Sequence, residues 1–278
     1  LNLILYMSLR KLKYAGLPVE LKKNEAHNFA NNYAINIYRK KAIYTMIPKN
    51  LCSTLRYSIA ISNGLITKNN IKWIHFNNFT FNPSLKDIAE ADYTFVVLRC
   101  PFRRLVSCFL DKIVDQKMYR KEYLREKSSI FSKFPKKIQN KMFSIFDNPK
   151  DINFSNFVES LKDIKHNEYD IHWRPQIDFL LYDNYDDYFA FENFKDVKNI
   201  LLRKIDLDIY DARDLTKHGN NMYEHIEGDF QFTNCDEISI LKKSNKIPIY
   251  KCFYNDKIKN DVISIYKNDF ELYVQKFG

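Results

Sequence analysis

The sequence predicts a mixed α/β fold, built as one domain with a central parallel β-sheet flanked by helices. Short apolar runs alternate with segments of helical periodicity along the chain. This alternation is typical of parallel sheets whose strands are joined by helical crossovers. Hydrophobic residues make up 45% of the 278 residues, which is enough for a sizeable core, and only 5 Gly argue against a many-turned β-sandwich.

The core of the sheet is expected within about residues 42–115. Apolar runs rich in β-formers predict buried strands at residues 42–47, 71–76 and 93–98. Helical spacing predicts the intervening and following helices at residues 53–62, 84–90 and about 102–115. Pro48 ends the first strand, and Ser53 is a plausible N-cap of the first helix.

The remainder of the chain adds elements around this sheet. Residues of about 116–165 are strongly charged and predict a mostly helical insertion, and acceptor-side and C-terminal elements occupy 166–278. Within the latter we expect a strand, a helix, an irregular polar stretch and a closing amphipathic helix, at 188–192, 194–204, 211–250 and 256–274.

The charge and the cysteines limit the class of protein. A net charge of +10 favours an anionic ligand such as a phosphorylated nucleotide, a polysaccharide or a nucleic acid, although the lysine runs are equally explained as solvated faces. The five cysteines show no CxxC pair, so neither a zinc site nor a disulfide framework is predicted. A reducing compartment is the simpler interpretation.

The first residues do not resemble a membrane anchor. Only the first six are continuously apolar, whereas about 20 are needed to cross a bilayer. A basic n-region and a long apolar h-region are also missing. We therefore expect no membrane span and a cytoplasmic location, with the Golgi lumen an alternative only if an N-terminal anchor has been removed.

The segment that follows the first predicted strand has the properties of an anion-binding loop. The free backbone N–H groups and the dipole of a helix N-terminus favour negative charge. Lys49 adds an ammonium group, and Ser53 and Thr54 add hydroxyl donors. The segment does not match GxxxxGK[ST], so a Mg²⁺-nucleotide loop is not predicted. Without glycine the turn is expected to be tight and free of positive φ, and an ordinary strand-to-helix turn explains it equally well.

A second candidate anion site follows the strand 93–98. Arg99 stands at its carboxyl end, where open α/β sheets bind ligands, and Pro101 suits the first turn of a helix. Ser107 lies about two turns into that helix. A guanidinium and a hydroxyl together can hold a phosphate, because Arg binds phosphate oxygens bidentately. A structural salt bridge of Arg99 and a small helix residue at Ser107 are the alternatives.

Several segments together resemble the sulfotransferases that use 3′-phosphoadenosine 5′-phosphosulfate (PAPS), specifically the carbohydrate or Golgi-type branch (family 2). The order of the matches follows that family, and Cys100 stands where an Asp is usual. The similar segments are IPKNLCSTLR (47–56), VVLRCPFRRLVSCFLDKI (96–113), HWRPQIDFL (172–180), FENF (191–194) and IYKNDFELY (265–273).

The resemblance implies a P-loop-like fold and a PAPS site without a metal, with 3′,5′-adenosine bisphosphate (PAP) as the product. Lys49 would contact the phosphosulfate, and Arg99 with Ser107 would hold the 3′-phosphate. KSNK (243–246) is similar to a segment that covers the nucleotide in relatives. The cofactor-binding residues implied are Lys49, Asn50, Leu51, Cys52, Ser53, Thr54, Arg99, Ser107, Ser244 and Lys246.

Sulfuryl transfer also needs a base for the acceptor hydroxyl and a surface for the acceptor. His75, at the end of the predicted strand 71–76, is the first candidate base because relatives place a His or Glu after this strand. His172 competes for the role, and a histidine without a catalytic role remains an alternative for His75. His172, Trp173 and Arg174 are also expected to bind the substrate, since aromatic faces suit sugar rings and Arg suits anionic sugars.

The expected activity is therefore transfer of a sulfuryl group to a hydroxyl, most readily on a glycan, with no nucleic acid as partner. Two alternatives remain open on the residues alone. One is a basic protein that binds nucleic acid or another polyanion, which predicts steeply salt-dependent binding. The other is a nucleotide kinase-like enzyme with a degenerate phosphate loop, which would need a Mg²⁺-binding carboxylate after a strand.

Overall fold

The computed structural model describes residues 9–77, 79–116, 152–162, 164–212 and 223–278. The chain divides into two compact units. The first comprises Leu1–Cys100, Pro175–Lys217 and Leu272–Gly278, and the second comprises Pro101–Arg174 and His218–Glu271. Most of the predicted helical insertion, 116–165, lies outside the described residues. The mixed α/β fold with a mostly parallel central sheet flanked by helices is confirmed.

The first unit is built on a four-stranded sheet with the order β1-β2-β3-β4. Strands β2, β3 and β4 are parallel, and β1 runs antiparallel to β2. The predicted strands at 42–47, 93–98 and 188–192 are thus confirmed, while the antiparallel β1 was not foreseen. The strands are β1 (Ala34–Ile37), β2 (Ala42–Thr45), β3 (Tyr93–Leu98) and β4 (Asp187–Ala190).

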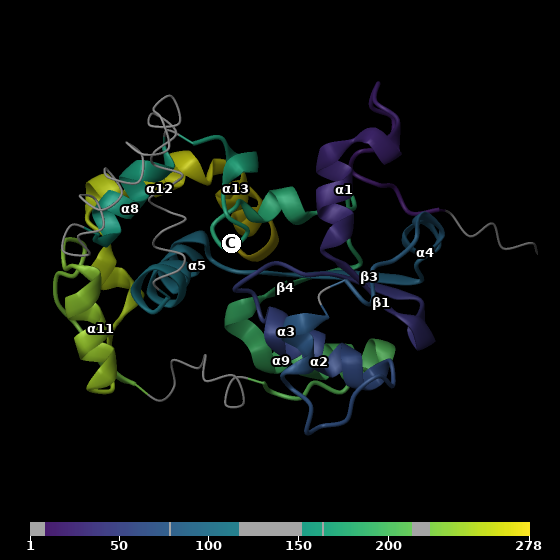
Figure 1. Ribbon diagram of the computed structural model, residues 1–278. Coiled ribbons are helices and arrows are strands. Elements are labelled where there is room, and N and C mark those ends of the chain that lie inside the picture. Colours follow the sequence, from purple (N-terminus) through teal and green to yellow (C-terminus); the bar gives the residue numbers. More distant parts are fainter. Residues whose placement is uncertain (1–8, 78, 117–151, 163, 213–222) are drawn as a thin grey trace, which may run out of the picture. The chain divides into compact units, whose positions relative to one another are not determined.

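Helices cover the two faces of this sheet. In Figure 1, α2, α3 and α9 lie on one side of the strands and α1 lies on the other. The described helices of this unit are α1 (Glu25–Asn32), α2 (Cys52–Ser62), α3 (Trp73–Phe76), α4 (Leu85–Ala89) and α9 (Phe194–Ile205). Short 3₁₀ turns join them at Leu21–Lys23, Tyr38–Lys40, Gln176–Phe179 and Phe191–Asn193.

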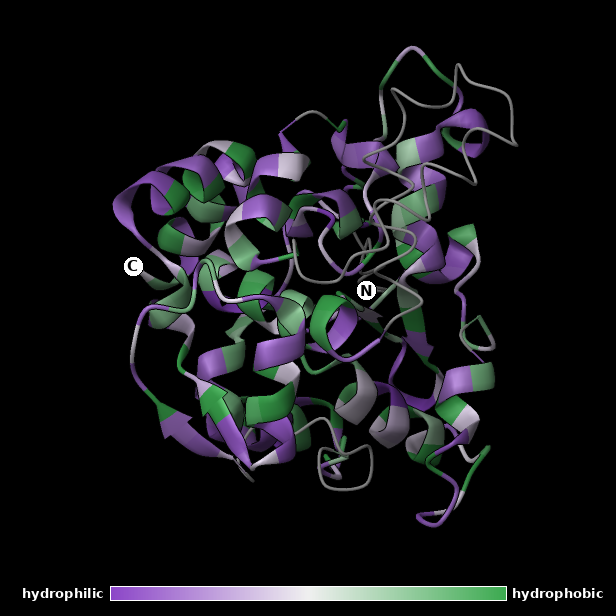
Figure 2. Ribbon diagram, turned by 60° about the vertical axis from the view of Figure 1, so that its left-hand side comes forward, coloured by the Kyte–Doolittle hydropathy of each residue, from purple (hydrophilic) through white to green (hydrophobic). Residues whose placement is uncertain are grey.

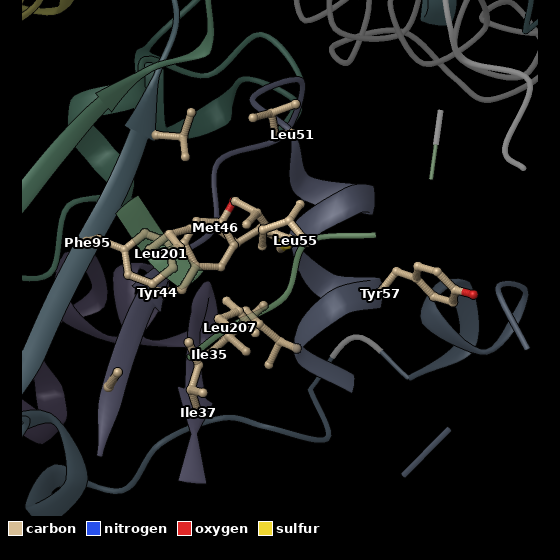
Figure 3. Packing of buried hydrophobic residues seen from close by; sticks show 14 of the residues in the cluster. Ile35, Ile37, Tyr44, Met46, Leu51, Leu55, Tyr57, Phe95, Leu201 and Leu207 are labelled. Atoms are coloured by element: carbon tan, nitrogen blue, oxygen red, sulfur yellow. The ribbon is translucent and has the colours of Figure 1, made fainter. Parts of the chain in front are cut away.

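The core between the sheet and α2 is largely aromatic and aliphatic. Tyr44 of β2 stacks on Phe95 of β3 with ring centroids 5.0 Å apart. Figure 3 shows both rings beside Met46, with Leu55 of α2 facing the same cluster. Burial of this apolar surface stabilises the unit by about 25 cal/mol per Å². It also fixes where β2 ends and α2 begins, and so positions the loop between them.

The predicted strand at 71–76 is wrong. Its residues form a turn and the one-turn helix α3, held by local bonds such as the N–H of His75 to the carbonyl of Lys72 at 3.1 Å. Only Ile74 of α3 is buried, and its carbonyl accepts a hydrogen bond from the guanidinium of Arg56. A short run of aromatic and β-branched residues does not distinguish a strand from a helical turn, because both can bury one apolar side chain.

Other helix predictions are confirmed with shifted ends. The helix at 84–90 is α4, with Ser84 as N-cap in a capping box with Asp87. The predicted N-cap Ser53 lies inside α2, which begins after Leu51 instead. The helix expected at about 102–115 is present as α5 (Pro101–Cys108) followed by a π-helical stretch. The closing helix expected at 256–274 is two helices, α12 (Asp256–Ile265) and α13 (Lys267–Phe277), interrupted at Tyr266.

The second unit is mainly helical. Its α-helices are α5 (Pro101–Cys108), α8 (Phe154–Leu161), α11 (Cys235–Lys243) and α12 (Asp256–Ile265), and Phe109–Val114 is π-helical. It also contains 3₁₀ turns at His166–Glu168 and Tyr250–Phe253, and the parallel strands β5 (Glu224–Ile226) and β6 (Lys246–Pro248). The last helix, α13 (Lys267–Phe277), has residues in both units. The prediction that residues 211–250 form an irregular stretch is therefore wrong, because β5, α11 and β6 lie within it.

Aromatic side chains form the core of the second unit. Phe109 contacts the rings of Phe154, Phe157 and Phe253, with centroids 5.3 to 6.1 Å apart. The helical ribbons carry both hydrophobic and hydrophilic stretches in Figure 2, as amphipathic packing requires. Across the described part of the chain, no helix has both the length and the apolar character to cross a membrane.

Candidate functional site

Three parallel strands of the first unit end at the same edge of the sheet. Lys49 follows β2, Arg99 follows β3, and Phe191 follows β4. This is the edge at which open α/β sheets bind ligands, because the loops leaving parallel strands gather there. Two of the three were predicted as ligand contacts from the sequence, and the structure brings them together.

The loop after β2 contains two residues in the left-handed region. Lys49 has φ 72° and Leu51 has φ 61°. The expectation of a turn without positive φ is therefore wrong. A non-glycine residue in this region costs about 1–2 kcal/mol. The Leu51 side chain offsets part of this cost, since it is buried in the same core cluster as Leu55 at the start of α2 (Figure 3). The backbone strain thus coincides with the predicted anion loop.

Helix α2 begins without a side-chain cap. Its N-cap is Leu51, whose side chain cannot accept a hydrogen bond from the first turn, and no acidic residue lies in that turn. By contrast, Asn24, Asn153, Asn234 and Asn255 cap α1, α8, α11 and α12 through their side chains. The N–H groups of the first turn of a helix have no partner inside the helix. At α2 these donors and the helix dipole suit an anion.

Arg99 links the ends of two strands. Its Nη1 donates to the carbonyl oxygen of Lys49 at 3.0 Å. Its guanidinium lies over the ring of Phe191, 4.1 Å from the centroid, which is a favourable cation–π distance. The side chain is thus held by contacts at the ends of both neighbouring strands.

A buried amide pair lies beneath these contacts. Asn50 donates from Nδ2 to the carbonyl of Val97 at 2.9 Å and to Oε1 of Gln176 at 2.6 Å. Gln176 also accepts from the N–H of Arg99 at 3.0 Å and donates to the carbonyl of Arg99 at 2.9 Å. The sequence predicted no role for Gln176, which is a member of the HWRPQIDFL segment. No local sequence pattern indicates the hydrogen-bond partners of a buried amide.

Glu192 is a further residue at this edge that the sequence did not single out. Its Oε1 accepts from the N–H of Cys100 at 3.3 Å, and its Oε2 accepts from the hydroxyl of Tyr273 at 2.9 Å. Cys100 stands where the resemblance to the PAPS sulfotransferases leads us to expect an Asp. Its backbone is held here by a carboxylate from the FENF segment, so the chain at residue 100 is positioned without that Asp.

A half-buried cation lies within the first turns of α2. Burial lowers the pKa of Arg56, and the neighbouring Cys52 and Tyr44 oppose this shift. Burial likewise raises the pKa of Tyr44 well above its ordinary value, so its hydroxyl is neutral. Arg56 therefore adds positive charge behind the first turn of α2. Charge held in a poorly solvated place acts over longer distances than charge at the surface.

His75 lies on α3 and is exposed. Its predicted place at a strand end is wrong, because residues 71–76 are not a strand and do not belong to the sheet. His75 therefore does not follow a strand of the sheet, as Lys49 and Arg99 do. A role as base stays a prediction for this residue.

In the second unit, His172 is paired with a carboxylate. Its Nδ1 lies 2.6 Å from Oδ1 of Asp170, and its backbone N–H donates to the same oxygen at 2.9 Å. The carbonyl of His172 accepts from the thiol of Cys108 on α5 at 2.6 Å. A carboxylate on Nδ1 leaves Nε2 as the proton acceptor of the neutral ring. Asp170 was not predicted from the sequence, although it lies two residues before His172.

The predicted acceptor residues beside His172 differ in exposure. Trp173 is fully buried, and its ring meets that of Phe157 edge-on at 5.6 Å. The expectation that it lines an acceptor groove is corrected, since its faces are covered by the core. Arg174 is half-buried, and its Nη1 donates to the carbonyl of Asn167 at 3.3 Å.

Cys52, Ser53 and Thr54 open α2 in the first unit, whereas three other predicted cofactor residues lie in the second unit. Ser107 is half-buried on α5. Ser244 is the C-cap of α11, and Lys246 begins β6 with its ammonium 3.8 Å from a carboxylate oxygen of Glu224. Both are exposed. Among the residues that the structure describes, no cluster of three or more His, Cys, Asp or Glu is arranged to hold a metal ion.

Comparison with known proteins places the chain in a family. A sequence model of the sulfotransferase family matches residues 34–274. No curated protein and no solved structure gives a significant match. The family match starts at β1, includes the loop at Lys49 and the strand end at Arg99, and ends in α13. It extends over far more than half of the sequence, so this protein belongs to the sulfotransferase family.

Proposed function

We propose that the protein transfers a sulfuryl group from PAPS to a hydroxyl of a carbohydrate. The observation that carries the donor half of this proposal is the hydrogen bond from Arg99 to the carbonyl of Lys49, which joins two cationic residues at the carboxyl edge of the sheet. Two such cations suit a nucleotide with separate phosphate groups. The carbohydrate acceptor rests on resemblance to the Golgi-type branch.

The residues of the loop after β2 fit a 5′-phosphosulfate. The uncapped start of α2 offers the N–H groups of residues 52–54, and the hydroxyls of Ser53 and Thr54 lie in the same turn. The left-handed conformation of Lys49 and Leu51 shapes the backbone before that turn. We assign Asn50 to this group through its backbone, since its side chain is committed to Val97 and Gln176.

The chemical step is an in-line displacement at sulfur. An acceptor oxygen forms a new S–O bond while the S–O bond to the bridging phosphate oxygen breaks, and PAP leaves with that electron pair. Negative charge grows on the bridging oxygen, so an ammonium there stabilises the transition state more than the ground state. Lys49 is proposed for this role. The acceptor hydroxyl loses its proton to a base.

Two histidines are proposed for that base, and their surroundings differ. His172 has a carboxylate partner on Nδ1, which orients the ring and stabilises its protonated form. His75 is exposed on a one-turn helix, and relatives supply the reason to consider it. The pairing with Asp170 favours His172. Arg174 is proposed to bind an anionic acceptor, and Ser107, Ser244 and Lys246 to bind the nucleotide.

Binding of PAP tests the donor assignment most directly. A ligand that binds only the folded state raises the melting temperature by mass action. We expect PAP to raise it without Mg²⁺, and ATP with Mg²⁺ to do so much less. Transfer of labelled sulfate from PAPS to capsule-type and glycosaminoglycan oligosaccharides then tests the acceptor class. A protein stabilised by ATP with Mg²⁺ but not by PAP would refute the proposal.

A further inference from the structure

Gln176 occupies a buried position where one side chain contacts both loops of the donor edge. It is 1% exposed, and Asn50 is 0% exposed. One amide group of Gln176 makes three hydrogen bonds, two to the backbone of Arg99 and one to the side chain of Asn50. The partners lie 77 and 126 residues away in the sequence. Because this amide is shielded from solvent, its hydrogen bonds are strong and hold the surrounding backbone in one geometry.

The pattern of donors and acceptors determines the orientation of this amide. Oε1 faces two donors, the N–H of Arg99 and Nδ2 of Asn50, whereas Nε2 faces the carbonyl of Arg99. A flipped amide would place donors against donors. Both protons of the Asn50 amide are used as well, one on Gln176 and one on Val97. The network therefore has one arrangement.

The consequence is a mechanical link between the two strand ends. Asn50 lies between Lys49 and Leu51, whose backbones are in the left-handed region, so the loop needs external support to keep that shape. Gln176 holds the backbone of Arg99, and the side chain of the same residue contacts Lys49. Loss of the Gln176 amide would leave buried donors and acceptors unpaired at both places.

We infer that Gln176 is a positioning residue for the donor nucleotide, which sets the loop of Lys49 and the backbone of Arg99 in register. This inference rests on the proposed function. It assigns to the donor side a residue from the HWRPQ segment, whose preceding residues were expected to serve the acceptor. Gln176 acts through Asn50 and Arg99 and does not itself contact PAPS.

A volume-conserving substitution tests this role with little change in packing. Gln176→Met keeps the length of the side chain but removes all three hydrogen bonds. We expect the affinity for PAP to fall by roughly tenfold to a hundredfold. The KM for PAPS should rise by a similar factor, while the KM for the acceptor should stay within about twofold. Thr94→Val is the matched control, since it removes two part-buried hydrogen bonds between the Thr94 hydroxyl and Asp186 at the amino end of the same strand β3.

A double-mutant cycle tests the route through Asn50. Asn50→Leu alone should also weaken PAP binding, and the double variant should lose much less than the product of the two single effects, because each substitution breaks the shared bond. The effects of Gln176→Met and Thr94→Val on PAP affinity should instead be independent, so that their fold-changes multiply in the double variant. Hydrogen–deuterium exchange of peptides containing residues 47–52 and 97–101 provides a readout without ligand, and both should exchange faster in Gln176→Met.

The outcomes separate the inference from the proposed function. Wild-type protein that does not bind PAP would refute the proposed function, and the donor role of Gln176 with it. A wild type that binds PAP, together with a Gln176→Met variant of unchanged PAP affinity and unchanged exchange in both peptides, would refute only the role of Gln176. Independent effects of Asn50→Leu and Gln176→Met would likewise overturn the link.

Discussion

Arg99 donates a hydrogen bond to the backbone carbonyl of Lys49 across 3.0 Å, although the two residues are 50 positions apart in the chain. The contact uses one nitrogen of the guanidinium, and the flat face of the group lies on Phe191. Arg99 is thus both a structural tie and a cation at the sheet edge. Its replacement should affect both properties, and suitable variants can separate them.

Arg99→Lys should retain the charge but lose the planar contacts. A lysine cannot donate to the Lys49 carbonyl while presenting a fork to phosphate, and it stacks less well on Phe191. We expect the affinity for PAP to fall about tenfold to a hundredfold, in line with the loss of charge-assisted hydrogen bonds. Isothermal titration calorimetry measures this. Arg203→Lys, at an exposed position on α9, is the control and should bind as wild type does.

Lys49→Gly and Lys49→Ala should differ in stability but not in activity. Both remove the ammonium, so both should lose sulfate transfer. Glycine adopts φ 72° without the steric cost that alanine keeps, so the glycine variant should be more stable by about 1 kcal/mol. Urea denaturation compares the two variants.

Lys41 provides the control for this backbone effect. It has φ 43° and is exposed after the turn Tyr38–Lys40, away from the proposed donor residues. Lys41→Gly should therefore be more stable than Lys41→Ala to a comparable degree, with transfer unchanged in both. Equal stability of the two Lys49 variants, beside a clear difference at Lys41, would show that the loop at Lys49 is not strained.

The two candidate bases predict different kinetics. If His172 is the base, His172→Ala should lower the single-turnover rate by about 10² to 10⁴, and His75→Ala should leave it unchanged. Asp170→Asn should lower the rate less, because an Asn oxygen still accepts from the backbone N–H of His172 but no longer stabilises the imidazolium. Rapid-quench measurement of the first turnover over a pH series distinguishes these cases. A loss of rate in His75→Ala alone would assign the base to His75.

A buried histidine predicts how stability depends on pH. Burial lowers the pKa of His27 on α1, so the folded state binds this proton less readily than the unfolded state. The contribution of the neutral, buried His27 to the free energy of unfolding is complete above the unfolded pKa of about 6.5. It is lost as the pH falls through the lower pKa of the folded state. Unfolding should therefore become easier between neutral and mildly acidic pH. Calorimetric melting at several pH values should show a smaller decrease for His27→Gln than for wild type, whereas replacement of the exposed His225 should change nothing.

Local patterns in the sequence were sufficient to predict the elements that carry the donor edge. Strand β3 occupies the predicted residues 93–98, and β2 lies within 42–47, because continuous apolar runs bounded by Pro or polar residues leave few alternatives to a buried strand. Lys49 and Arg99 were predicted from their places directly after these strands. The motifs around them also indicated the family, which the match over residues 34–274 confirms.

Tertiary structure alone decided how these elements are held. The antiparallel β1, the helical turn at His75, the left-handed Lys49 and Leu51, and the partners of Gln176 have no signal within a few residues of the sequence. The partners of Gln176 lie 77 and 126 residues away in the chain. Strand β1 pairs with the adjacent β2, and α3 is closed by local hydrogen bonds, so there packing selected one of several structures that are possible locally. Side-chain periodicity reports only which face of an element is buried, whereas a buried amide finds its partners only when the folded chain brings them within about 3 Å.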